Sequence, residues 1–178
     1  GIPRDAKVVL FVAEIVDNAR KGYVQLMTAL SRCSKELDGL WLLSVGHKGS
    51  RRPEGMRGSH LSHIDNERFL SLVYSAADVF VIPSLQDNLP NTVLEALACG
   101  VPVIGFDVGG IPDMVREGET GRLVKCGDID GLRRAIVELL QSLELRHGLS
   151  RKAREVAVEE YALRRQAEAY ADLYATLV

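Results

Sequence analysis

The sequence lacks the features by which several large classes of protein are recognised. No uninterrupted apolar stretch approaches the length of a bilayer span, and no signal-peptide pattern opens the chain. An excess of one charge is also missing, because Lys plus Arg number 22 and Asp plus Glu number 24, which leaves a net charge of −2. This balance gives no electrostatic footprint for nucleic acid or an anionic membrane, so neither is expected as a partner.

Paired cysteines are absent as well. The three cysteines are far apart and show no CxxC spacing, which disfavours a disulfide framework and a zinc site. A reduced, cytoplasmic setting is therefore expected. The chain begins at Gly1 without a methionine, so we expect it to be a piece of a longer protein.

The sequence does contain a regular alternation of apolar runs and helical segments. Its 178 residues, 47% apolar and 26% charged, are ordinary for one domain with a hydrophobic core. Continuous apolar strands that alternate with helices indicate an α/β fold, a doubly wound, Rossmann-like parallel sheet with helices on both faces. Ligands of such sheets bind beyond the carboxyl ends of the strands. The apolar runs predict strands at 7–12, 40–45, 78–82, 101–106 and 122–125.

Apolar spacing of three and four residues predicts the helices. Asp65 is the expected N-cap of the helix that includes residues 70–77. Residues 46–60 are rich in Gly, Ser, Pro and basic residues and are predicted to be a mobile loop. The spacing predicts a helix that begins near Tyr23, one over 70–77, one over 132–143 and two within 150–178.

The most informative stretch is 83–102. A strand ends at Pro83, a polar loop follows, and a helix is predicted to start at Asn91 or Thr92 and to end at Gly100. The start of a helix is an anion site, because its first N–H groups lack partners and the dipole is positive there. Either residue at the start is expected to cap the helix and to offer its N–H group to a phosphate.

Two carboxylates flank this helix start. Glu95 lies about one turn into the helix, where it could accept hydrogen bonds from the vicinal hydroxyls of a ribose, and Asp87 stands in the loop, eight positions earlier. Together they suit a ligand with a sugar at each end and a diphosphate between them. From the residues alone a second interpretation stays open, in which Asp87 is a turn residue and Glu95 a helix-dipole partner on a solvated face.

Asp87 and Glu95, followed by Ala96-x-Ala98-x-Gly100-x-Pro102, resemble the signature of the retaining family-4 glycosyltransferases of the GT-B fold. Residues 76–84 upstream and 108–124 downstream are also similar to that family. The resemblance covers about residues 5–143.

The resemblance implies that residues 1–178 form the C-terminal, nucleotide-sugar-binding domain of a glycosyltransferase. Its core would span about 5–143, with C-terminal helices over 144–178, and the N-terminal acceptor domain is absent from this chain. Such an enzyme transfers a sugar from a UDP- or GDP-sugar to an acceptor with retention of configuration, in polysaccharide or glycoconjugate biosynthesis. No metal cofactor is expected, since the residues at the diphosphate are cationic. Any membrane association is expected from the absent domain.

The resemblance also assigns roles to single residues. Glu95 would bind the ribose hydroxyls, and Asp87 would face the transferred sugar. Leu89, Asn91 and Thr92 would bind the donor, with amides near the last two meeting the phosphates. The acidic position that Asp87 occupies is usually Glu, which is one methylene longer.

Basic residues complete the expected site. Lys21 precedes the first helix and would neutralise the departing diphosphate, although a surface lysine at a helix start is the simpler alternative. The Arg that the family places after the first strand is replaced by Glu14, and Arg20 is the candidate to substitute for it. His63 is a candidate for contact with the edge of the nucleobase.

Several alternatives stay open at the level of sequence. The domain could be a non-catalytic binding or scaffold module of the same fold, or belong to a nucleotide-sugar epimerase. Gly109 and Gly110 either admit the phosphates of the donor or make a turn. Residues 161–178 would pack across both domains of an intact enzyme, and in this chain their aromatic stripe is either core or an apolar patch without its partner.

Overall fold

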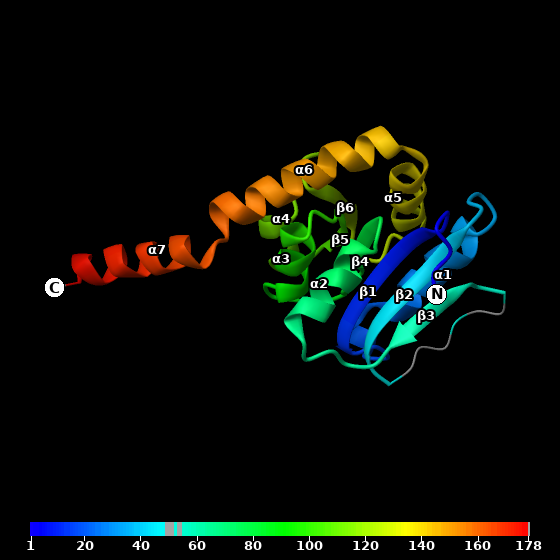
Figure 1. The fold of residues 1–178 in the computed structure, drawn as a ribbon, viewed down its shortest axis with the longest axis horizontal. Helices are drawn as coiled ribbons and strands as arrows, with labels where there is room; N and C mark the ends of the chain where they lie inside the picture. The colour runs from blue at the N-terminus through cyan, green and yellow to red at the C-terminus, as the bar shows by residue number, and fades with distance from the viewer. Residues whose placement is uncertain (49–51, 53–54, 178) are drawn as a thin grey trace.

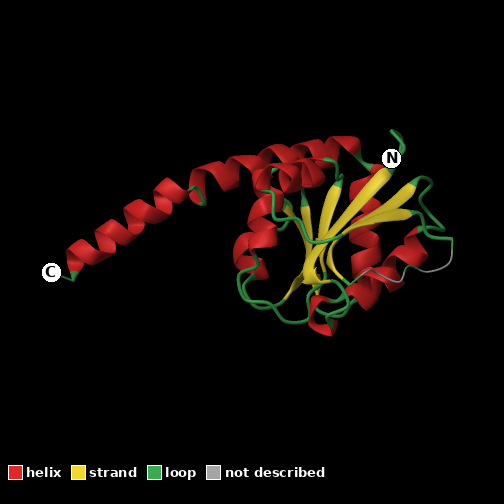
Figure 2. Ribbon diagram, turned by 60° about the horizontal axis from the view of Figure 1, so that its bottom comes forward, coloured by secondary structure: helices red, strands yellow, loops and turns green. Residues whose placement is uncertain are grey.

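Six parallel strands form one sheet at the centre of the molecule (Figures 1 and 2). The computed structural model describes residues 1–48, 52 and 55–177. The order in the sheet is β3-β2-β1-β4-β5-β6, so the chain runs outward from β1 on one side and then returns to build the other side from β4. The strands are β1 (Lys7–Ile15), β2 (Leu40–His47), β3 (Gly58–Leu61), β4 (Val79–Ile82), β5 (Val103–Asp107) and β6 (Gly121–Lys125).

Helices cover both faces of the sheet, which confirms the doubly wound prediction (Figure 2). In β1, Val9 and Phe11 pack on one face and Val8 and Leu10 on the other, so this central part of the strand is apolar because both of its sides are buried. The helices are α1 (Tyr23–Cys33), α2 (Glu67–Ser75), α3 (Asn91–Ala98), α4 (Ile111–Met114), α5 (Ile129–Gln141), α6 (Leu143–Glu160) and α7 (Leu163–Thr176), with a 3₁₀ turn η1 (Ala19–Lys21).

The prediction of a loop throughout 46–60 is wrong at both ends, because β2 continues to His47 and Gly58–Leu61 forms β3, an edge strand paired in parallel with β2. Residues 49–51 and 53–54 of that prediction lie outside the described part of the chain. The predicted cap of the next helix is also displaced by one residue. Asn66, not Asp65, is the N-cap of α2, and its side chain accepts a hydrogen bond of 2.8 Å from the Phe69 amide.

The helical segment predicted over 132–143 is divided. Ser142 adopts an extended backbone and caps α6, accepting a hydrogen bond of 3.2 Å from the Leu145 amide, so Leu143 begins a new helix and is exposed. α6 then buries Leu149 and Ala153 in the two core clusters. The packed body therefore continues past residue 143.

α7 extends away from the rest of the molecule (Figure 1). None of its residues is buried, and Tyr170, Leu173 and Tyr174 are more than half exposed. The interpretation of this stripe as core is therefore wrong, and among residues 1–48, 52 and 55–177 this apolar patch has no partner. In the described part of the chain, no helix is both long enough and apolar enough to cross a membrane.

Candidate functional site

The site lies at the carboxyl edge of the sheet, where β1 and β4 are neighbours and the order of the strands reverses. The chain leaves β1 through η1, and it leaves β4 through the loop 83–90. These two segments touch, because the Leu85 amide donates a hydrogen bond of 2.8 Å to the Arg20 carbonyl. Gly22 allows the approach, since it has a φ of +73° and a Cβ there would lie 1.7 Å from the Pro83 carbonyl oxygen.

Lys21 and Asp87, both predicted as site residues, form an ion pair at this contact although they lie 66 positions apart in the chain. The Lys21 Nζ lies 2.7 Å from Asp87 Oδ2, which also accepts a hydrogen bond of 3.0 Å from the Ser84 hydroxyl. The Asn88 amide contacts the other oxygen at 3.2 Å. The side chains of Lys21 and Asp87 are 24% and 11% exposed, so the pair is sheltered but reaches the surface.

The loop after β5, which contains Gly109 and Gly110, packs against the backbone of Asp87 and Asn88. Gly109 has a φ of +57°, and a Cβ there would lie 1.8 Å from the Asp87 carbonyl oxygen. The Gly110 amide donates a hydrogen bond of 2.8 Å to the Asn88 carbonyl. The two glycines form a turn that packs on the loop 83–90, as one of the two sequence interpretations held.

The start of α3 faces the same edge. Its N-cap is Pro90, not Asn91 or Thr92 as predicted, and no side chain caps the helix. The amides of Asn91 and Thr92 therefore belong to the first turn, where no intrahelical acceptor exists and the helix dipole is positive. Leu89, just before the cap, is 63% exposed. The helix start is thus equipped to meet an anion.

Glu95 is half-buried on α3 and has a partner that the sequence did not indicate. The Tyr74 hydroxyl donates a hydrogen bond of 2.8 Å to Glu95 Oε2. Burial, and then the negative charge of Glu95, raise the pKa of the Tyr74 phenol far above its usual value, so it stays protonated and remains a donor. A buried tyrosine hydroxyl usually has a hydrogen-bond partner, so Tyr74 on the apolar face of a helix was the signal in the sequence that could have indicated such a contact.

The remaining candidates lie further along the edge. The Arg20 side chain is exposed and has no hydrogen-bond or ion-pair partner among the described residues. Glu14 lies near the exposed end of β1. The ring of His63 stacks on that of His47 at 4.9 Å, and its Nε2 lies 3.0 Å from Asp65 Oδ1. His63 thus follows β3, at the far side of β2 from the ion pair.

No group of three or more His, Cys, Asp or Glu side chains that could hold a metal ion occurs within residues 1–48, 52 and 55–177. An Asp-x-Asp sequence is present at Asp128–Asp130, but its carboxylates serve the fold. Asp128 caps α5 through a hydrogen bond of 2.8 Å from the Gly131 amide, and Asp130 pairs with Arg32 at 2.6 Å. The expectation that no metal is needed stays a prediction.

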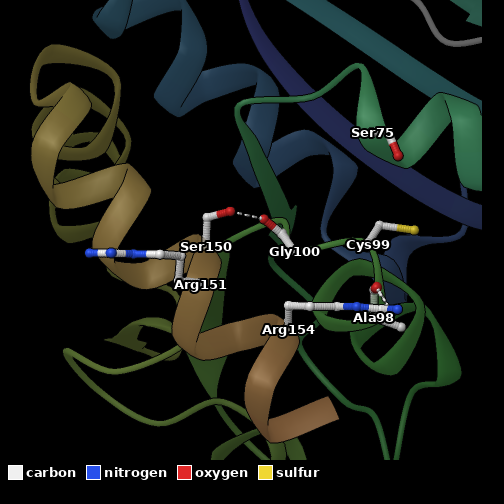
Figure 3. A pocket seen from close by; sticks show the side chains of 7 residues that line it. All are labelled: Ser75, Ala98, Cys99, Gly100, Ser150, Arg151 and Arg154. Atoms are coloured by element: carbon white, nitrogen blue, oxygen red, sulfur yellow. Dashed lines mark hydrogen bonds between the residues drawn. The ribbon is translucent and has the colours of Figure 1, made fainter. Parts of the chain in front are cut away.

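A hollow of about 600 Å³ lies at the opposite end of α3, against α6 (Figure 3). Its polar groups bond to one another. The Ser150 hydroxyl donates a hydrogen bond of 2.6 Å to the Gly100 carbonyl, and the Arg154 guanidinium donates to the Ala98 carbonyl. Arg151 points away from these contacts (Figure 3). Side chains of α6 thus satisfy carbonyls at the end of α3.

The chain is similar in sequence to parts of known glycosyltransferases. A family model described as "Glycosyl transferases group 1" matches residues 6–142. The phosphatidyl-myo-inositol mannosyltransferase of Mycobacterium leprae is 35% identical over 174 residues, which cover 93% of this chain and 44% of that protein.

Solved structures show the same fold. Sucrose-phosphate synthase of Thermosynechococcus elongatus has a TM-score of 0.82 and 29% identity, over 98% of this chain and 46% of that one. HepE of Anabaena in complex with UDP-glucose has a TM-score of 0.82 and 19% identity, over 97% of this chain and 49% of that one. The chain spans about half or less of the length of the curated relatives it matches.

Proposed function

The chain belongs to the family of group 1 glycosyl transferases, and we propose that it forms the nucleotide-sugar donor site of such an enzyme. The observation that carries the proposal is the meeting of Lys21, Asp87 and the uncapped start of α3 at the strand-order switch. A cation and free amides together suit a diphosphate, and Glu95 stands one turn behind them for the ribose.

The proposed reaction is substitution at the anomeric carbon of the donor sugar. The bond from that carbon to the diphosphate oxygen breaks and the diphosphate leaves with the electron pair. An acceptor hydroxyl oxygen bonds to the carbon on the same face, with retention of configuration, and its proton passes to the departing diphosphate oxygen. Lys21 and the amides of Asn91 and Thr92 oppose the negative charge that develops on the leaving group. Asp87 holds Lys21 in place and faces the transferred sugar.

Other parts of the donor would be met along the same edge. Arg20 is free to take the diphosphate position that Glu14 leaves without a cation, and Leu89 would contact the donor beside the helix start. His63 would contact the edge of the nucleobase. HepE binds UDP-glucose in the same fold, so a UDP-sugar is the first donor to test, followed by a GDP-sugar.

The whole enzyme would consist of this C-terminal domain and an N-terminal acceptor domain. The exposed apolar stripe of α7 supports this arrangement, because it would be covered by the second domain. We place the enzyme in the cytoplasm, in the assembly of polysaccharides or glycoconjugates, with any membrane contact made by the other domain.

A thermal-shift titration of the chain with UDP, GDP and ADP tests the donor site. One nucleotide at tenfold its Kd should add about 1.4 kcal/mol of stability, and each kcal/mol raises Tm by about 2–4 °C in a chain of this size. Glu95→Ala should weaken binding roughly tenfold or more, and Arg151→Ala, at the opposite end of α3, should leave it unchanged. The absence of any shift at millimolar nucleotide would contradict the proposal.

Binding without turnover would favour the scaffold alternative. The engagement of both Asp87 oxygens by groups of this chain is the observation on its side. The full-length protein is then supplied with an acceptor and with the nucleotide-sugar whose nucleotide binds. If the protein is a transferase, it should release the nucleoside diphosphate. Retained donor binding with no release would identify a binding module.

A further inference from the structure

We infer that Tyr74 is a positioning residue for the donor, because it holds the carboxylate of Glu95 in the orientation that receives the ribose hydroxyls. The inference rests on the proposed donor site and deepens it. Tyr74 does not touch the donor in this arrangement and acts through Glu95.

Tyr74 is well suited to hold another side chain, because it is itself immobilised. It is 1% exposed and is one of only two residues that α2 buries. Its ring packs edge-on against Phe80 of β4, with the ring centroids 5.7 Å apart. The hydroxyl therefore projects from a ring that is fixed on all sides, between the sheet and α3.

The two oxygens of the Glu95 carboxylate differ in their hydrogen-bond partners. Oε2 accepts from Tyr74 at 2.8 Å, whereas Oε1 has no protein donor among the described residues. Side chains of a helix lean toward its N-terminus, so we expect the second oxygen of Glu95 to face the carboxyl edge of the sheet, where α3 begins. One oxygen is thus anchored and the other remains available at the edge.

The surroundings of the Tyr74 phenol also keep it in its protonated form. The phenol is buried beside a carboxylate, and both surroundings oppose its ionisation. The phenol of Tyr74 therefore keeps its proton, and its hydroxyl donates to Glu95. A carboxylate held in this way loses little rotational freedom when it meets the ribose.

Calorimetric titration of the chain with UDP and with 2′-deoxy-UDP separates this role from a structural one. The measured quantity is the ratio of the two dissociation constants, which reports the preference for the 2′-hydroxyl and is insensitive to a general loss of affinity. Tyr74→Phe removes the hydroxyl and keeps the ring on Phe80. It should weaken UDP binding roughly threefold to tenfold and lower the preference ratio by a similar factor.

Two further variants complete the design. Glu95→Ala should bring the ratio close to one, and the double variant Tyr74→Phe/Glu95→Ala should match Glu95→Ala, because the hydroxyl acts through the carboxylate. A thermal melt of each variant in the absence of nucleotide confirms that it is folded.

The outcomes distinguish the inference from the proposed function. If Glu95→Ala abolishes the preference and Tyr74→Phe leaves it intact, the positioning role is wrong and the donor site stands. If Tyr74→Phe strengthens the preference, the phenol competes with the ribose for Glu95, which also overturns the inference. If Glu95→Ala itself changes nothing, the ribose contact of the proposed function fails, and the inference fails with it.

Discussion

The two ends of α3 differ in whether side chains of the protein satisfy its terminal backbone groups. At its end, α6 supplies Ser150 and Arg154, whose side chains satisfy the carbonyls of Gly100 and Ala98 (Figure 3). At its start, no side chain caps the helix, and Asp87, which pairs with Lys21, lies in the loop that leads into it. One end is closed by the fold, whereas the other keeps its donors for something outside it.

When a helix has polar groups at both ends, the end whose hydrogen bonds are not made within the chain is the better candidate for a ligand site. The hollow at the closed end, lined by two arginines, resembles a binding site, but Ser150 and Arg154 already make their hydrogen bonds within the chain. At the open end three loops approach so closely that Gly22 and Gly109 have no room for a side chain. Such close packing of loops around unpaired amides is typical of a preorganised anion site.

The largest effect is expected from a methyl group at the open end. Gly22→Ala places a Cβ 1.7 Å from the Pro83 carbonyl oxygen in a left-handed backbone, so η1 and the loop 83–90 must separate. We expect a loss of about 3–5 kcal/mol in the free energy of unfolding, measured by denaturant titration. Gly148→Ala is the control, because nothing lies within 4 Å of its Cβ position in α6, and it should be neutral or stabilising. Equal effects of the two variants would show that the loops are not in contact.

Removal of the cation should affect the ligand more than the fold. Lys21→Met keeps the length of the side chain and deletes the charge that pairs with Asp87. UDP should bind roughly tenfold more weakly, whereas uridine, which carries no phosphate, should bind as before. Calorimetry on both ligands checks this, and an equal loss for uridine would mean that Lys21 does not face the diphosphate.

A smaller effect, on stability alone, is expected at the closed end. Arg154→Ala leaves the Ala98 carbonyl without its donor and should lower the free energy of unfolding by about 1 kcal/mol. The affinity for UDP should not change. Arg151→Ala, which removes an exposed cation of the same helix, is the matched control and should be neutral. A change in UDP affinity for Arg154→Ala would move the ligand to the closed end.

The smallest effect is expected from removal of α7, which contributes no residue to either end of α3. A chain that stops at Ala162 loses no buried residue. Its free energy of unfolding in urea should match that of the full chain within about 0.5 kcal/mol. A larger loss would show that α7 packs on this domain in solution.

The features that depend on local chemistry were predictable from the sequence. Continuous apolar runs predicted β1, β2 and β4 because these strands are buried on both faces. Gly100, at a φ of +69°, ends α3 as predicted. The acidic and basic residues of the open end were identified through the family signature, and the structure brings Lys21 and Asp87 together.

What the sequence did not indicate depends on neighbours that are distant in the chain. The strand Gly58–Leu61 lacks an apolar run because it is a short, half-buried edge strand that owes its form to β2. Tyr74 read as an apolar position on a helix, since only the fold brings its hydroxyl to Glu95. The apolar face of α7 predicted burial, yet none of the residues that the structure describes covers it.

A two-dimensional ¹H–¹⁵N NMR titration of the chain with UDP tests most directly whether the open end of α3 is the ligand site. The amides of Gly22, Asn91, Thr92 and Gly109 should shift as UDP is added, and those of Gly100 and Ser150 should not. Shifts centred on Gly100 and Ser150, or none at the start of α3, would contradict the assignment of the donor site.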